Sequence, residues 1–321
     1  MKIETIQLNN QNPQVTLTTY LLADSPEVLK GQSRPAVIIC PGGGYFSCSD
    51  REAEPVAMAF AAQGYHAFVL NYTTYGDGGL DMPDLSKPLP VKQDRLYPHQ
   101  LHDLGRAMIY VKQHAEAWHV NPDQVVVCGF SAGGHNAALY ATNWDNPELA
   151  KALNVDAEQL KPCAAILGYA LTDYVFLQQD IQSKSPMDIS FMRASNVAFL
   201  GLEDPTPEQL EAVSPAHQVS ATTPPMFIWG TANDPLVSCQ HAIKMAGALA
   251  TEKIPFELHI FENGPHGLSL ATPATSEAKT QVFPDVAAWT TLCATWLKKH
   301  VRLPLNALSD FEKMVQSGQS H

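Results

Sequence analysis

The sequence predicts an α/β fold in which a mostly parallel β-sheet is flanked by helices. Short apolar segments alternate with longer amphipathic ones, which is typical of doubly wound α/β proteins. Several apolar segments, such as AVIIC and VVVCGF, are continuous aliphatic runs, as expected of strands buried on both faces. We expect strands at 15–22, 36–40, 66–71, 125–130, 164–169, 226–229 and 256–261, and helices at 52–63, 100–118, 132–142, 240–251 and 285–300. Segment 15–22 alternates in polarity and is expected to be an antiparallel edge strand.

Two stretches interrupt this alternation and are predicted to be insertions into a single domain that spans 1–321. They cover about 73–98 and 173–213, and both follow expected strands. Both should therefore emerge at the carboxyl edge of the sheet, where open α/β sheets bind their ligands. The tail at about 301–321 is polar, carries a short expected helix at 308–316, and is predicted to be an appendage or a contact element.

The composition excludes several classes of function. The chain has 321 residues, a hydrophobic fraction of 45% and a formal net charge of −12, so nucleic acid is not an expected partner. No apolar run approaches the roughly 20 residues that cross a bilayer, and the first residues lack the apolar stretch of a secretory signal. We therefore expect a cytoplasmic protein without a membrane partner. Cys40, Cys128, Cys163 and Cys293 lie in apolar segments and are expected to be buried, reduced thiols.

The strongest local signal is Gly129-Phe130-Ser131-Ala132-Gly133, a G-x-S-x-G motif. It follows a buried strand and precedes a helix rich in small residues, which is the context that a nucleophile on a strained strand-to-helix turn requires. The alternative is a glycine-rich turn in which the serine caps the helix. We predict the α/β-hydrolase fold, with Ser131 as the nucleophile.

A second motif, Pro41-Gly42-Gly43-Gly44-Tyr45, directly follows the strand at 36–40. Acyl transfer needs preorganised N–H donors for an oxyanion, and glycines let the backbone approach that oxygen and adopt positive φ. The alternative is an ordinary flexible turn. We interpret this segment as an oxyanion hole, completed by the N–H of Ala132.

The general base and its acid should follow the serine in the order acid, then histidine. Among 12 histidines, His266 lies in a Gly/Pro turn just after the last expected strand. Asp234 follows the strand at 226–229, whereas Asp173 follows the strand before it. We favour Asp234, one strand–helix unit before the histidine, and regard Asp173 as a helix cap or turn residue.

These motifs, together with GFSAGGH and GTANDPLV, resemble the bacterial esterases related to acetyl-xylan and feruloyl esterases, of the BD-FAE type and close to the hormone-sensitive-lipase type. The similarity extends over about 36–270. It implies hydrolysis of short acyl esters, often on acetylated sugars, by a Ser-Asp-His triad without a cofactor or metal. It also implies oxyanion donors at Gly43, Gly44 and Ala132. The proline at 41 departs from the HGGG form of the lipase-like branch and resembles the sugar-esterase side.

Other residues and other functions also fit parts of the sequence. Tyr45, Tyr72 and His135 are candidates for contact with a small-molecule ester substrate, although core packing also fits Tyr72 and His135. His99, His102 and Asp103 have a spacing like that of metal ligands. No HExxH motif and no further cluster of ligand residues accompanies them, so a metal site is not expected. A peptidase of the same fold and a non-catalytic binding protein are the alternative functions. Assembly into a homo-oligomer is left open.

The first insertion predicts the kind of ester. Its charged side chains form a polar rim unsuited to a lipid chain, which favours a short acyl group on a polar alcohol. The rim consists of Asp77, Asp81, Asp84, Lys87, Lys92, Asp94 and Arg95.

Overall fold

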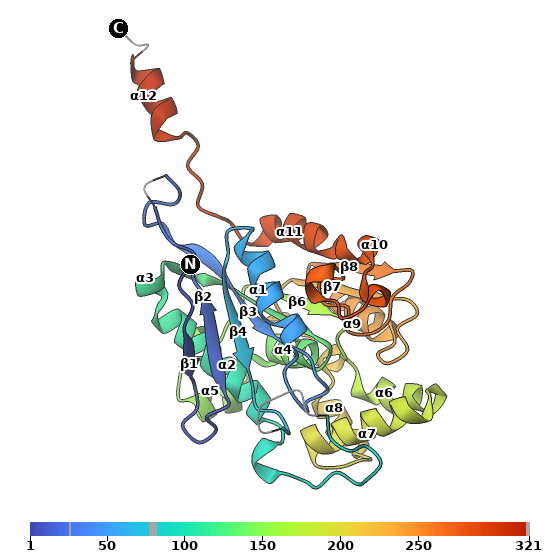
Figure 1. The fold of residues 1–321 in the computed structure, drawn as a ribbon. Helices are drawn as coiled ribbons and strands as arrows, with labels where there is room; N and C mark the ends of the chain where they lie inside the picture. The colour runs from blue at the N-terminus through green and yellow to red at the C-terminus, as the bar shows by residue number, and fades with distance from the viewer. Residues whose placement is uncertain (26, 77–81, 319–321) are drawn as a thin grey trace.

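A computed structural model describes residues 1–25, 27–76 and 82–318. Asp77 and Asp81 of the expected polar rim lie outside the described residues. The described strands form one eight-stranded sheet in the order β1-β2-β4-β3-β5-β6-β7-β8, with helices on both sides (Figure 1). In the described chain the strands are β1 (Thr5–Gln7), β2 (Thr16–Tyr20), β3 (Arg34–Cys40), β4 (His66–Asn71), β5 (Val120–Phe130), β6 (Ala164–Gly168), β7 (Met226–Thr231) and β8 (Phe256–Phe261).

Strands β3 to β8 pair in parallel, whereas β1 and β2 are antiparallel to their neighbours. The mostly parallel sheet flanked by helices is confirmed. The expected edge position of the segment at 15–22 is wrong, because β1 pairs along its outer side. Strand β1 is only three residues long and carries no apolar run, so its sequence gave no signal of a strand.

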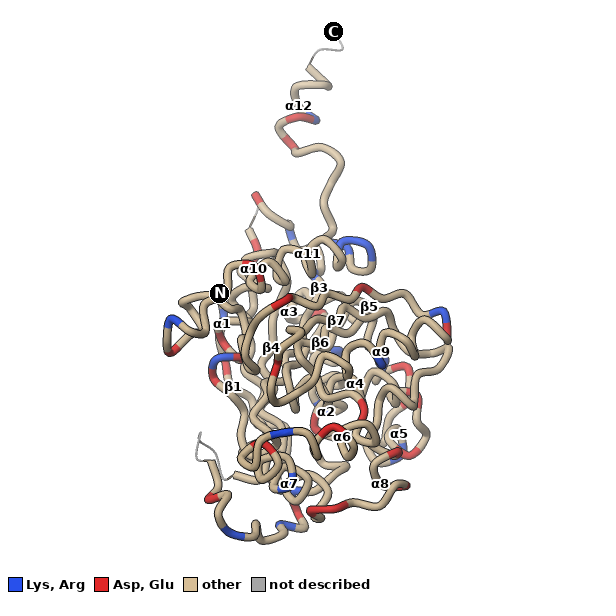
Figure 2. The backbone as a smooth tube through the Cα atoms, turned by 90° about the vertical axis from the view of Figure 1, so that its right-hand side faces the viewer, with Lys and Arg blue, Asp and Glu red and all other residues tan. Residues whose placement is uncertain are grey.

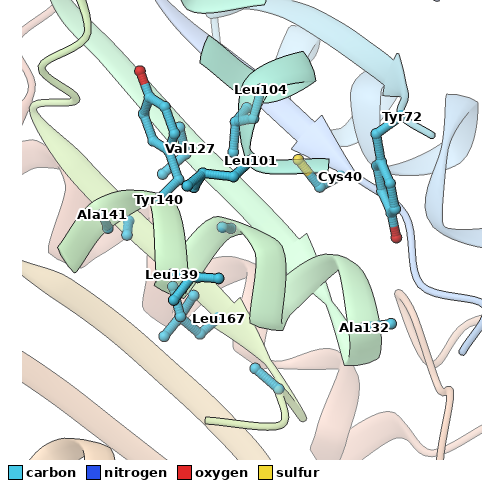
Figure 3. Close-up of a cluster of buried hydrophobic side chains, with 14 of the residues drawn as sticks. Cys40, Tyr72, Leu101, Leu104, Val127, Ala132, Leu139, Tyr140, Ala141 and Leu167 are labelled. Atoms are coloured by element: carbon cyan, nitrogen blue, oxygen red, sulfur yellow. The ribbon is translucent and has the colours of Figure 1, made fainter. Parts of the chain in front are cut away.

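Both faces of the central sheet are buried. Successive residues of each central strand point to opposite faces and pack into two different hydrophobic clusters. In β3, Ala36, Ile38 and Cys40 pack into one hydrophobic cluster, while Val37 and Ile39 pack into the other. The first cluster lies under α2 (His99–Gln113), α4 (Ser131–Asn143) and α9 (Gln240–Thr251), and Figure 3 shows part of it around Leu104, Val127, Leu139 and Leu167. The second lies under α1 (Glu54–Ala61) and α11 (Trp289–His300).

The second insertion is helical rather than irregular. It contains α6 (Tyr174–Asp180), α7 (Pro186–Leu200) and α8 (Pro207–Ala212). Side chains cap the N-termini of α7 and α8. The Ser185 side chain accepts from the N–H of Asp188 at the start of α7, and Thr206 with Gln209 forms a capping box at the start of α8. Helices α7 and α8 lie together at the end of the molecule opposite the C-terminal tail (Figures 1 and 2).

The remaining α-helices lie outside the second insertion and include a C-terminal helix that projects from the protein. The remaining helices of four or more residues are α3 (Ala115–Trp118), α5 (Pro147–Leu153), α10 (Pro284–Ala287) and α12 (Asp310–Gly318), so the helices expected at 100–118 and 285–300 are each divided in two. Helix α12 has no buried residue and projects away from the sheet (Figure 1). Within the described residues, no helix is long and apolar enough to span a bilayer.

The six cysteines are all free thiols. Cys40, Cys128 and Cys293 are buried as expected, but Cys163 is only partly buried because it lies just before β6 rather than inside it.

Candidate active site

Ser131 sits on the sharp turn between β5 and α4 and has a φ of 51°. A non-glycine residue in this left-handed region is strained, which is characteristic of a nucleophile elbow. The small neighbours are required by close approach: a Cβ at Gly133 would lie 2.1 Å from the Cys40 carbonyl oxygen, and one at Gly129 would lie 2.1 Å from that of Gly133. A side chain at either position would therefore force the turn or the backbone beside it to shift.

His266 lies in the turn after β8 and reaches both of its expected partners. The Ser131 hydroxyl and His266 Nε2 are 2.8 Å apart, and His266 Nδ1 and Asp234 Oδ2 are 2.7 Å apart. An ionised carboxylate can only accept, so Nδ1 carries the proton and Nε2 is free to accept from the serine hydroxyl. The structure thus brings together the three side chains that an acyl transfer by a serine hydroxyl uses.

Asp234 is held in place by the loop that carries it. Its Oδ1 accepts hydrogen bonds from the N–H groups of Leu236 at 2.9 Å and Val237 at 3.0 Å, so the other oxygen is left to face His266. Asn233 accepts from the N–H of Gly264 at 2.8 Å, and this bond ties the acid loop to the histidine turn. Asp234 itself is 8% exposed.

Asp173 has a different role. It caps α6 by accepting from the N–H of Phe176 at 2.8 Å, and it forms ion pairs with His217 at 3.2 Å and Lys244 at 3.5 Å. The geometry therefore places Asp234, not Asp173, against the histidine.

The pKa of His266 is raised above the ordinary value of 6.5. Burial lowers it, but the charge and hydrogen bond of Asp234, together with the charge of Glu52, outweigh burial. An imidazole with a raised pKa is a stronger base, which suits removal of a proton from a serine hydroxyl.

The glycine turn after β3 lies against the elbow. Gly43 and Gly44 have φ values of 136° and 61°, and a Cβ at Gly42 would lie 2.9 Å from the Cβ of Ser131. Within the described chain, the N–H groups of Gly43, Gly44 and Ala132 have no protein acceptor. These unpaired donors lie on the two segments that meet at the elbow, as the predicted oxyanion hole would require.

Helix α7, which belongs to the second insertion, packs against the glycine turn after β3. The Ser195 hydroxyl donates to the Gly44 carbonyl oxygen at 2.9 Å, and Phe191 lies so close that a Cβ at Gly44 would be 2.6 Å from its ring. Phe199 stacks on Tyr45 with ring centroids 4.2 Å apart. The second insertion thus helps to set the conformation of the glycine turn.

The predicted substrate contacts of Tyr45, Tyr72 and His135 are not supported, because their exposed fractions are 1%, 2% and 0%. The Tyr45 hydroxyl is hydrogen-bonded to His135 Nδ1, and the other ring nitrogen of His135 donates to the Val213 carbonyl at 2.8 Å. Tyr72 donates to the Pro41 carbonyl at 2.6 Å. The polar side-chain atoms of all three are thus hydrogen-bonded within the protein, which fits a role in packing.

The histidines at 99 and 102 do not gather around Asp103. Asp103 is buried and accepts from the N–H and hydroxyl of Thr73 at 2.9 and 2.5 Å, and it pairs with Arg106 at 2.7 Å. Over the ranges 1–25, 27–76 and 82–318, no three His, Cys, Asp or Glu side chains are arranged to hold a metal ion.

Sequence reasoning missed Glu52, Tyr169 and Ser195. Glu52 is a buried carboxylate that accepts from the N–H of Gly42, and Tyr169 packs edge-on against His266 with centroids 5.0 Å apart. None of the three belongs to a local motif: Glu52 and Tyr169 are 117 positions apart, and Ser195 is 151 positions from its partner Gly44. The one available signal for Tyr169 was its position at the carboxyl end of an expected strand.

The sheet, the elbow and the order serine, acid, histidine define an α/β hydrolase. Residues 89–249, half of the chain, match the family model described as BD-FAE, and the chain belongs to that family.

Known proteins similar to the chain include an endo-1,4-beta-xylanase B from Butyrivibrio fibrisolvens, 32% identical over 74% of this chain and 33% of that protein. The crystal structure of an acetyl ester-xyloside bifunctional hydrolase from Caldicellulosiruptor lactoaceticus is 29% identical, with a TM-score of 0.70 over 92% of this chain and 96% of that one. The α/β hydrolase MGS-M1 from a Medee basin deep-sea metagenome library is 33% identical, with a TM-score of 0.68 over 94% and 99% of the two chains. The chain spans less than two thirds of the length of the curated relatives it matches.

Proposed function

We propose that the protein is a serine esterase that hydrolyses acetyl and other short acyl esters of a polar alcohol such as a sugar. The observation that carries this proposal is the hydrogen-bonded series from Ser131 through His266 to Asp234, with free backbone donors beside the serine. The non-catalytic alternative fits poorly, because a binding protein has no need of a strained serine aligned with a base.

The mechanism follows from the positions of these groups. Ser131 Oγ attacks the ester carbonyl carbon as its proton passes to His266 Nε2, and the oxyanion is stabilised by the N–H groups of the glycine turn and Ala132. The bond to the alcohol oxygen then breaks, and that oxygen takes the proton from His266. Water next attacks the acyl-serine and gives a proton to His266. The carboxylic acid leaves, and Ser131 recovers its proton.

The choice of substrate rests on the insertions and on the relatives. The described rim residues of the first insertion are polar and partly paired, as in the Asp84–Lys87 ion pair at 2.9 Å. The solved relative from Caldicellulosiruptor is named for acetyl ester and xyloside hydrolysis. Phe191 of α7 packs against Gly44 and Phe46, and we expect it to limit the length of an acyl chain that binds beside the glycine turn.

The decisive experiment labels the protein with a fluorophosphonate and compares the wild type with Ser131→Ala. We expect labelling and hydrolysis to be lost together, because removing a triad nucleophile costs on the order of a millionfold in turnover. Labelling of another serine, with activity retained in the variant, would contradict the assignment.

A series of nitrophenyl esters tests the acyl specificity. Each methylene that fits a pocket adds at most about 0.8 kcal/mol of burial, and one that does not fit loses this contribution and clashes. We expect acetate and propionate to exceed octanoate, with no turnover of palmitate. A kcat/KM that still rises beyond eight carbons would indicate a lipase, and turnover of aminoacyl nitroanilides alone would indicate a peptidase.

A further inference from the structure

A buried carboxylate connects the glycine turn to the histidine turn. Glu52 is 4% exposed and lies in the short helix η1 (Asp50–Glu52). Its Oε2 accepts from the N–H of Gly42 at 2.6 Å, and its Oε1 accepts from the hydroxyl of Tyr169 at 2.5 Å. The Tyr169 oxygen in turn accepts from the N–H of Ser269 at 2.9 Å. This single path therefore joins segments that follow β3, β6 and β8.

The neighbouring residue Arg51 strengthens the same connection. Its guanidinium donates to the carbonyl oxygens of Gly267 at 2.7 Å and Thr275 at 2.6 Å, and its own carbonyl accepts from the Ser269 hydroxyl at 2.6 Å. The segment next to His266 is thus held to η1 from both the backbone and the side chain of Arg51.

The hydrogen bonds indicate the charge on Glu52. The N–H of Gly42 and the N–H of Ser269 can only donate, and Tyr169 uses its single proton toward Glu52. Both oxygens of Glu52 therefore accept, and this pattern fits the ionised form, which brings no additional donor to be satisfied. The pKa of Glu52 is raised above its ordinary value of 4.5, because burial outweighs the opposing bonds to Tyr169 and Gly42 and the charges of His266 and Arg51.

We propose that Glu52 is a positioning residue that holds the glycine turn in register with His266 through Tyr169, and that its buried negative charge stabilises the imidazolium formed during the reaction. This inference rests on the proposed function of Ser131, His266 and Asp234. Glu52 does not touch the reacting atoms; it acts through Gly42 and through the field at His266.

Other charged and titratable groups surround this pair and must be considered in a pH experiment. The groups that act on the pKa of His266 or Glu52 include Asp234, Lys184, Arg51 and Tyr169. Burial raises the pKa values of Tyr72, Cys48 and Cys128, and the charge of Glu52 in turn raises them further. The Asp234 carboxylate is the larger influence on His266, so loss of Glu52 should weaken the base without abolishing it.

The first test compares Glu52→Gln with the matched control Glu54→Gln, in which an exposed carboxylate two residues further along is neutralised. The rate of fluorophosphonate labelling of Ser131 and the kinetics of nitrophenyl acetate hydrolysis are measured across pH. For Glu52→Gln we expect kcat to fall roughly tenfold to a hundredfold, less than the 10²–10³ that follows loss of an oxyanion donor. In the plot of rate against pH, the acid limb is the fall in rate as His266 becomes protonated. This limb should move to lower pH, because removing the negative charge of Glu52 lowers the pKa of His266. The control should match the wild type.

The second variant, Tyr169→Phe, keeps the ring against His266 and the charge of Glu52 but removes the connecting hydroxyl. We expect a reduced kcat with the acid limb in its wild-type position. The inference is overturned if Glu52→Gln loses rate with no movement of the acid limb, since that is the result of a purely structural role. If Glu52→Gln does not fold, a Tyr169→Phe enzyme with wild-type kcat overturns it instead. A wild type that is neither labelled nor active would refute the proposed function itself, which is a distinguishable result.

Discussion

Substitution of Asp234 by Asn is the sharpest test of the candidate site, because it exchanges one acceptor for a donor at nearly constant volume. In the wild type, Oδ1 accepts from two backbone N–H groups and Oδ2 accepts from His266. The asparagine oxygen should take over the two backbone bonds, so the amide nitrogen would face His266 Nδ1. Two donors cannot share one hydrogen bond, and the imidazole should therefore move its proton to Nε2.

That tautomer cannot accept a proton from Ser131. The equivalent change in the chymotrypsin triad lowers kcat by about 10⁴-fold, which corresponds to about 5 kcal/mol of transition-state stabilisation. We expect a loss of this order with little change in KM and an intact fold, since no buried volume is lost.

The assay is hydrolysis of nitrophenyl acetate, with circular dichroism to confirm folding. Asp173→Asn is the matched control, because Asp173 is equally buried but caps α6 and pairs with His217 and Lys244. We expect it to keep most of the activity. If Asp234→Asn lost less than a hundredfold, or if the control lost more than Asp234→Asn, the assignment of the acid would be refuted.

Three further outcomes follow from the structure. The kcat/KM of the wild type should fall as the pH decreases, with a midpoint above 6.5. His266 must be neutral to act as a base, and its pKa is raised above 6.5. A midpoint below 6.5 would contradict the electrostatic argument. Gly133→Ala should cost about 1–3 kcal/mol of unfolding free energy by overpacking against the Cys40 and Pro41 carbonyls, whereas Gly247→Ala, which meets no atom within 4 Å in α9, should stabilise by about 0.5–1 kcal/mol in thermal melts. Truncation after Asn306 should change stability by about 0.5 kcal/mol or less, because α12 contributes no buried residue, and a large fall in melting temperature would show that the tail is held by contacts beyond those described.

Local sequence was sufficient for those features whose physical cause is local. A buried aliphatic run followed by G-x-S-x-G specifies a strand, a tight turn and a helix within a dozen residues, and this predicted the position of Ser131 on the turn. The consecutive glycines after β3 are similarly explained by local geometry, because Gly43 and Gly44 adopt positive φ values that glycine tolerates without strain. The parallel sheet could be predicted for the same reason. A strand that is buried on both faces is a continuous apolar run, and this can be seen in the sequence of each strand by itself.

The tertiary structure alone decided between side chains that share the same local context. Asp173 and Asp234 both follow strands at the carboxyl edge, and only the path of the two loops shows that one caps a helix while the other meets His266. The burial of Tyr45 likewise depends on α7, which lies about 150 residues further along the chain.

The connection from Glu52 to Tyr169 joins residues 117 positions apart and belongs to no motif. Hydrogen bonds of this kind are determined by strand order and register, because these decide which loops meet at the edge of the sheet. The sequence by itself therefore determined the fold class and the position of the candidate nucleophile, and the packing of distant segments determined how the surrounding charges and glycines are held around it.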